Sequence, residues 1–231
     1  QTGGDRSLVV ANLARRFQAP GWYVEPTARL HMAQYRNDNT TGSNVSASRS
    51  VPTLSLDSGL VFERPANFFG TDYIQTLEPR AFATWTPFRD QSKLPNYDSG
   101  ARDFNLSSMF AENAFSGNDR ISDTRAVTLG VSSRLLDMGT GAEVIRLGVA
   151  QRALLADQSV TLPGGTPVTE RLSDTLVAAR VQWDPLWSLD TNIQYNTKSR
   201  ESKRSTIGGR YTPGPFKVLS AAYRIQRGTS E

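Results

Sequence analysis

The sequence contains no cysteine and only one histidine, His31, among its 231 residues. Without cysteine, the sequence has neither a disulfide nor a thiolate metal site. A single histidine supplies neither a histidine metal cluster nor the Ser-His-Asp set of a hydrolase. No GxxxxGK[ST] phosphate loop occurs. The sequence therefore predicts no metal, no cofactor and no catalytic residue, and hence a protein that is not an enzyme.

Long hydrophobic runs are also missing. No stretch approaches the roughly 20 apolar residues of a transmembrane helix. Residues 1–4 contain neither an initiator Met nor a recognisable signal peptide, so we expect either a processed protein or a section of a longer chain. The 26 Lys and Arg residues exceed the 22 Asp and Glu residues by a net charge of +4, with both signs interspersed. This mild excess predicts no nucleic-acid partner.

What the sequence does contain is a repeated two-residue period. The cleanest run alternates Trp187, Leu189, Thr191, Ile193 and Tyr195 with Ser188, Asp190, Asn192, Gln194 and Asn196. Comparable runs occupy 8–17, 22–32, 54–62, 73–85, 127–135, 145–152, 173–183, 204–212 and 217–227. Alternation of this kind is typical of strands whose two faces meet different surroundings. The sequence predicts about ten antiparallel strands.

The connections between these runs alternate in length. Short ones are expected at 19–21, 65–70, 138–142, 184–186 and 213–215, and longer ones at 37–49, 87–123, 156–172 and 197–203. Aromatic residues collect at both ends of the runs, as two bilayer interfaces would select. Together these features are typical of an antiparallel outer-membrane β-barrel, with short periplasmic turns and longer extracellular loops. We therefore expect an all-β fold in which 1–231 forms a single segment of a transmembrane barrel. The alternative, a water-soluble barrel or sandwich, would need a core face and is disfavoured by the many arginines on the polar faces.

Arginines mark the polar face of the predicted strands. They are Arg29, Arg80, Arg134, Arg146, Arg152, Arg180 and Arg210, with Arg224 beyond them. One interpretation is a cationic lumen lining that accepts an anionic cargo through guanidinium contacts. The other is a self-neutralising network with carboxylates of neighbouring strands, which is favoured for any single arginine. His31 lies in the same row and is expected to be an ordinary wall residue.

One segment, 86–125, breaks the period. Loops of this length are generally functional or disordered, and the apolar content of this one argues against disorder. We expect an ordered loop over 87–123 that folds back onto the structure and contacts a partner or plug, with a short helix over 105–114 capped by Asn105. The expected anchors are Phe88, Tyr97, Phe104, Phe110 and Phe115, with Arg89, Asp90, Asp119 and Arg120 fixing the two ends by paired hydrogen bonds.

The same region carries a family resemblance. GLVFERP at 59–65, QTLEPR at 75–80, FRDQSKLPNYDSG at 88–100, DFN at 103–105, FSGNDRISD at 115–123 and LGVSSRLLD at 129–137 resemble the C-terminal barrel region of the LptD family of lipopolysaccharide-assembly proteins. The resemblance runs from about residue 21 to 224, and the 75–137 block is its most specific part. Because about ten strands cannot form the whole family barrel, the chain resembles a middle section of it.

The resemblance implies a transport function in the outer membrane of a Gram-negative bacterium. Such a protein would receive lipopolysaccharide (LPS) from a periplasmic LptA-type bridge, through an N-terminal domain absent here, and insert it into the outer leaflet. The implied partners are LPS, an LptE-type lipoprotein plug and the lipid bilayer, with no nucleic acid. Members of the family often have disulfides. This sequence departs from that pattern, because it has no cysteine. A passive porin-type channel for small polar solutes is the alternative function.

Overall fold

A computed structural model of the chain describes residues 4–37, 45–68, 70–182 and 184–226. These residues form twelve strands and one short helix. The strands are β1 (Gly4–Ala14), β2 (Phe17–Ala19), β3 (Trp22–Asn37), β4 (Val45–Leu60), β5 (Phe62–Phe68), β6 (Thr71–Trp85), β7 (Arg125–Asp137), β8 (Glu143–Leu154), β9 (Thr175–Val181), β10 (Trp187–Asn196), β11 (Glu201–Gly214) and β12 (Lys217–Gln226), and the helix is α1 (Leu106–Met109).

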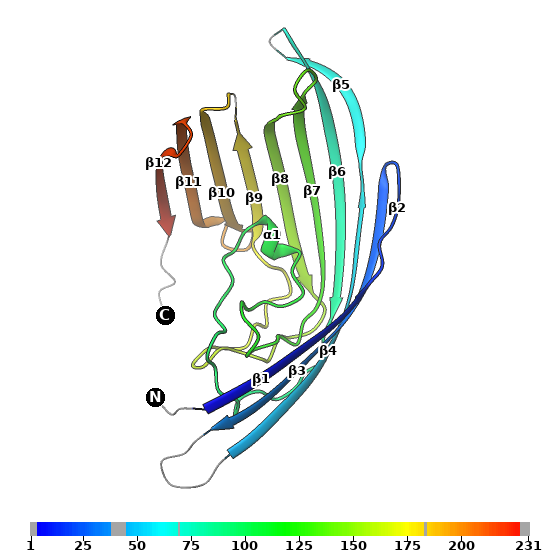
Figure 1. Cartoon of the computed structure of the whole chain (residues 1–231), viewed down its shortest axis with the longest axis vertical. Coiled ribbons are helices and arrows are strands. Elements are labelled where there is room, and N and C mark those ends of the chain that lie inside the picture. The colour runs from blue at the N-terminus through cyan, green and yellow to red at the C-terminus, as the bar shows by residue number, and fades with distance from the viewer. Residues whose placement is uncertain (1–3, 38–44, 69, 183, 227–231) are drawn as a thin grey trace.

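All strands belong to one antiparallel sheet. Its order is β1-β3-β4-β6-β7-β8-β9-β10-β11-β12, with β2 continuing the β1 side of β3 and β5 pairing with β6. The sheet is strongly curved and open, with β1 at one edge and β12 at the other (Figure 1). Successive strands joined by hairpins are the topology of an up-and-down barrel wall. The all-β, antiparallel fold predicted from the sequence is therefore confirmed, as a section of a barrel wall.

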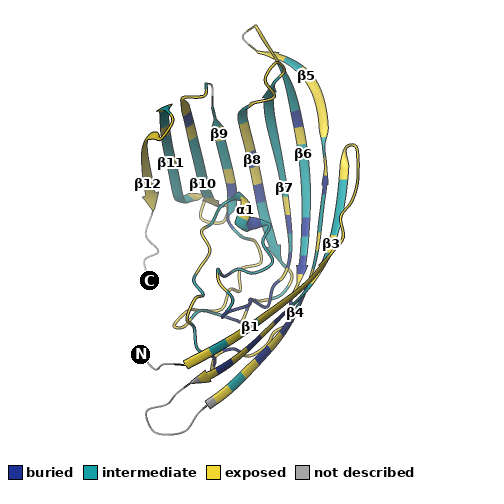
Figure 2. Ribbon diagram, viewed as in Figure 1, coloured by how far each residue is buried: buried dark blue, intermediate teal, exposed yellow. Residues whose placement is uncertain are grey.

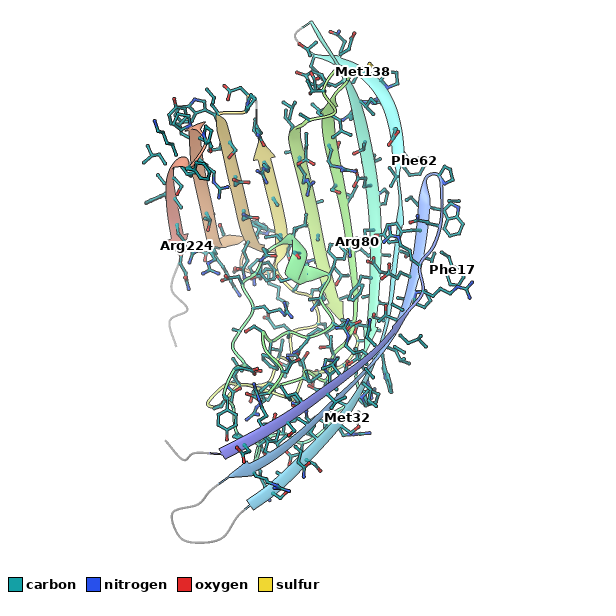
Figure 3. The ribbon with its side chains drawn as sticks, in the orientation of Figure 1. Phe17, Met32, Phe62, Arg80, Met138 and Arg224 are labelled. Carbon is teal, nitrogen blue, oxygen red and sulfur yellow. The ribbon has the colours of Figure 1, made fainter. Side chains whose placement is uncertain are left out.

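The two faces of the wall differ as the alternation predicted. The convex face exposes large apolar side chains across most strands, among them Leu54 on β4, Leu129 on β7 and Leu147 on β8, each at least half exposed. Phe17, Met32 and Phe62 lie on this outer side in Figure 3, whereas Arg80 lies on the side of the long loops. Buried positions concentrate where those loops meet the concave face (Figure 2). A continuous apolar outer face matches the lipid-facing band of a barrel.

Two of the predicted strands are each interrupted in the middle. β1 and β2 pair with β3 in one common register, so the break at Arg15 and Arg16 leaves the ladder aligned. In that register Arg15 stands opposite Pro26, which has no N–H to donate. β4 and β5 likewise share one register against β6, and the ladder to β6 is interrupted at Leu60 and Val61, which stand opposite Pro79 and Glu78. Twelve strands therefore appear where about ten were predicted.

Several predicted connections need correction. The connection expected to be long at 197–203 is four residues, 197–200, because β11 already begins at Glu201; the strict alternation of lengths is therefore wrong there. The turn expected at 65–70 is shorter, because β5 runs to Phe68 and β6 begins at Thr71. Pro65 lies within β5, which pairs only with β6 among the described strands. β11 runs through Pro213 to Gly214, so its turn is Pro215 and Phe216. Of the loop predicted at 37–49, residues 38–44 lie outside the described residues.

Two long connections occupy the concave side of the wall (Figure 1). We call residues 86–124, between β6 and β7, the inner loop, and residues 155–174, between β8 and β9, the second loop. The inner loop contributes Met109 to one buried cluster with Ala150 and Leu176, and Leu94 to another with Ala33 and Tyr35. The two buried apolar clusters of the described chain therefore lie where the inner loop meets the wall.

Candidate functional site

Asp119 joins the inner loop to the N-terminal strands. Its carboxylate is fully buried and accepts hydrogen bonds from Arg6 Nη1 of β1 at 2.8 Å and from Tyr35 Oη of β3 at 2.9 Å. It also accepts the backbone N–H groups of Tyr97 and Asp98, at 2.6 and 2.8 Å. Burial by itself raises the pKa of Asp119, but these four donors outweigh burial and lower the pKa to about 2. Asp119 is therefore an ionised hub between strands and loop.

Arg49 on β4 extends this attachment. Its guanidinium donates to the backbone carbonyls of Asp119 and Asn118, both at 2.6 Å, and to Gln91 Oε1 at 2.8 Å. Gln91 in turn spans the loop by exchanging hydrogen bonds with the backbone of Ile121. Neither Arg49 nor Gln91 was among the sequence candidates. Arg49 occupies an inward position of β4 next to Val51 and Thr53, and this inward parity was the only available signal.

Arg120 closes the loop on itself. Its guanidinium donates to the carbonyl oxygens of Leu94 at 2.7 Å and of Pro95 at 3.0 Å. The expected role of Asp119 and Arg120 in fixing one end of the loop through hydrogen bonds is thus seen. Arg89 and Asp90, expected to fix the other end, are exposed, and their side chains bond to the neighbouring Phe88 O and Ser92 N, not to the wall. That expectation is wrong, and the neighbouring Gln91 takes this part.

The second attachment of the inner loop is α1, which lies against β8 and β9 and is tied to β7 by Thr128. Asn105 caps the helix in a capping box with Ser108, as predicted, although the helix is shorter than 105–114. Thr128 Oγ1 donates to Met109 O at 2.8 Å, and Arg152 donates to the carbonyls of Met109 and Ala111. Arg152 therefore holds the loop backbone.

Two glycines on the wall make room for this attachment. A Cβ at Gly130 would lie 2.8 Å from Cζ of Phe110, and a Cβ at Gly148 would lie 2.9 Å from Cδ2 of Leu106. Because Cβ atoms do not approach other carbons this closely, a side chain at either position would force the tip of Phe110 or of Leu106 to move. The glycines on the concave face of β7 and β8 therefore define where the helix docks.

The aromatic anchors are only partly those expected. Phe115 is buried, and Phe104 and Phe110 pack on the cluster of Met109, with Phe110 also edge-to-face on Phe82 at 6.5 Å. Tyr97 is about half exposed, although its ring lies 6.4 Å from that of Tyr35. Phe88 is 51% exposed, so its expected role as a buried anchor is wrong. Phe88 sits at the loop base, where the adjacent Thr86 is buried instead.

The remaining arginines of the polar row lie on the concave face, and most of them pair with carboxylates. Arg80 forms a two-pronged pair with Asp57, at 2.9 and 2.6 Å, and Arg134 contacts Glu78 at 2.6 Å. Further contacts join Arg146 to Glu143, Arg180 to Asp190 and, through the inner loop, Arg29 to Glu112. Arg210 stands opposite Ser188 in the ladder. These arginine–carboxylate pairs are those that a self-neutralising network requires. The side chains of Arg146 and Arg180 nevertheless remain about half exposed on the lumen side.

An open cavity of about 650 Å³ lies between α1 and the wall. Leu106 and Phe110 form its loop side, and Arg80, Arg146 and Arg180 line its strand side together with Asp190 and Asn192. A second cavity, of about 320 Å³, separates residues 110–118 of the loop from β3 and β4 and is lined by Arg29 and His31. The wall therefore presents hydrophilic space beside the docked loop.

The described part of the chain contains no cluster of three or more His, Asp or Glu side chains arranged to hold a metal ion. Within the same residues, no helix has the length and apolar character to cross a membrane.

Comparison with known proteins identifies the family. The family model described as LptD, LPS transport system D, matches residues 1–231. The chain belongs to the LptD family. The LPS-assembly protein LptD of Polaromonas sp. (strain JS666) is 56% identical over 232 residues, which cover 100% of this chain and 28% of that protein. The LptD of Burkholderia thailandensis is 40% identical, covering 98% of this chain and 30% of that protein.

The chain thus spans less than a third of the length of these curated relatives. Among solved structures, one chain of the FpvAI-pyocin S2 complex aligns with 95% of this chain and 31% of its own length, at a TM-score of 0.33 and 18% identity. The LptD assignment comes from the sequence relatives alone. It agrees with the resemblance that the 75–137 block carries.

Proposed function

We propose that this chain forms part of the wall of an outer-membrane LPS translocon and takes part in inserting LPS into the outer leaflet. One observation carries the proposal: in a chain of the LptD family, an exposed apolar face and a charged face lie on opposite sides of a single curved sheet. An apolar outer face suits acyl chains, and a hydrophilic inner face suits the sugars and phosphates of LPS. Nothing in the family assignment favours the porin-type alternative.

The inner loop is the proposed contact for an LptE-type plug. It is held at two points, at Asp119 by Arg6 and Tyr35 and at residues 109–111 by Arg152, and so offers a fixed surface inside the wall. Its exposed Phe88 and Tyr97 are then better candidates for partner contact than for anchoring, because a buried side chain reaches no partner. An LptA-type bridge would act through parts of the full protein beyond this chain, and we propose no catalytic step for any residue described above.

The cargo role of the arginines is tested by charge reversal at Arg146 and Arg180, which line the large cavity and are half exposed. The full-length protein carrying Arg146→Glu and Arg180→Glu should assemble normally but deliver less LPS to the cell surface, measured by labelling surface LPS after induction. The matched control exchanges Arg180 and Asp190, which keeps the pair and the net charge.

If the double reversal lowers assembled barrel and surface LPS equally, these arginines serve the fold and the cargo role fails. Normal LPS delivery by the reversed variant would also refute it. Arg152 is unsuitable for this test, because its loss releases the inner loop whatever the cargo does.

A further inference from the structure

We infer that the inner loop is a cross-brace that sets the curvature of the wall, tying β1, β3 and β4 to β7 and β8. These two groups of strands are not neighbours, because β6 lies between β4 and β7 in the sheet. The brace is a property of this chain's fold and does not depend on the proposed transport function.

The need for a brace follows from sheet mechanics. Ladder hydrogen bonds fix the spacing of neighbouring strands, but the rotation between neighbours varies over about −10 to −35° in sheets generally. Five such interfaces separate β1 from β8 in the strand order, so the variation accumulates along the wall. A link between non-adjacent strands restricts this sum locally, in addition to any restriction from barrel closure. The inner loop makes such a link.

The first end of the brace consists of side chains from three strands. Arg6 and Tyr35 hold the Asp119 carboxylate, and Arg49 holds the carbonyl oxygens of residues 118 and 119. A further tie joins Glu112 to the wall, through Arg29 Nη1 of β3 at 2.8 Å and Ser55 Oγ of β4 at 2.6 Å. Arg6 supplies the tie to β1, the strand that pairs with β3.

The second end is the docking of residues 106–111 on β7 and β8. Thr128 and Arg152 bond to the loop backbone, and Gly130 and Gly148 admit Phe110 and Leu106 against the strands. Between the two ends, a cavity of about 320 Å³ separates residues 110–118 of the loop from β3 and β4. The loop therefore acts through discrete ties rather than continuous packing, as a brace does and a simple plug does not.

Hydrogen–deuterium exchange on the assembled full-length protein tests the inference. Asp119→Asn keeps the size of the side chain but removes the charge held by Arg6 and Tyr35. We expect exchange to rise about tenfold in the backbone amides of β1 and of 30–37 in β3, as well as in the loop, with no change in β10 and β11. Asp90→Asn is the matched control, because Asp90 is an exposed carboxylate of the same loop that bonds only to Ser92. It should leave all strands unchanged.

A second variant distinguishes loss of the tie to β1 from a general loss of stability in the loop. Arg6→Met removes the tie to β1 alone, and Tyr35 and Arg49 still hold the loop. Faster exchange confined to β1, with the loop still protected, is expected. Faster exchange in the loop alone for Asp119→Asn, with β1 and β3 as in the parent, would overturn the brace. Should Asp119→Asn not assemble, Arg6→Met decides by itself: an unchanged β1 refutes the inference.

Discussion

The outward face of the wall makes a sharp energetic prediction at Leu129. This side chain stands in the middle of β7, on the convex face, and is 60% exposed. On a surface that faces water, replacing so exposed a side chain by arginine should change the free energy of unfolding by no more than about 0.5 kcal/mol. On a lipid-facing barrel surface near the bilayer midplane, the same change costs about 2–4 kcal/mol. The loss of unfolding free energy caused by Leu129→Arg therefore differs several-fold between a water-facing and a lipid-facing surface.

The assay is denaturant unfolding of the protein folded into phospholipid vesicles, compared for Leu129→Arg and Asn192→Arg. Asn192 is a suitable control, because it also lies mid-strand, on β10, but faces the lumen side and lines the large cavity. We expect a loss of about 2–4 kcal/mol for Leu129→Arg and less than about 1 kcal/mol for Asn192→Arg. Equal losses for both would refute the assignment of the convex face to lipid.

Three other predictions concern the docked loop and the wall on which it lies. Gly130→Ala should destabilise the protein by about 1–3 kcal/mol through the clash with Phe110, measured by the denaturation midpoint, whereas Gly209→Ala, whose Cβ meets no atom within 4 Å, should not. The pKa of Asp119, about 2 in the folded chain against 3.8 as its ordinary value, means that its stabilisation is complete above pH 4 and is lost as the pH falls through 2. Pepsin cleavage within 86–124 should therefore accelerate steeply from pH 4 to pH 2, and a pH-independent cleavage rate would contradict the Asp119 attachment. Finally, exchanging the partners as Arg80→Asp with Asp57→Arg should recover most of the loss caused by Arg80→Asp alone, and a double-mutant cycle with no coupling would show that the pair is incidental.

The faces of the wall could be predicted from the sequence because the strand period is rigid. Once Ile193 is assigned outward, Asn192 must point inward, and the same parity placed Leu129 and Arg134 correctly. The breaks within strands could not be predicted in this way. The break at Arg15 reflects Pro26 on the neighbouring strand, and its position depends on a register that one strand alone does not contain.

The inner loop shows a second limit of prediction from the sequence. Its apolar content predicted correctly that it folds back onto the wall, but the choice among its aromatic residues was uncertain. Phe88 and Phe115 look alike in the sequence, yet one is half exposed and the other buried. The partners that matter, Arg6 and Arg49, lie 113 and 70 residues from Asp119 in the chain. No local pattern signals a contact at that separation.

The attachment of the inner loop rests on polar groups as much as on apolar burial. Gln91, Asp119, Arg120, Ser122 and Thr124 are all buried, and each has hydrogen-bond partners within the loop or the wall. Apolar contacts tolerate sliding, because many arrangements bury similar area. A buried carboxylate that loses its donors costs more than a lost contact, because its charge is left without compensation. A loop held in this way has one low-energy position, which is the requirement for a brace whose two ends must stay a fixed distance apart.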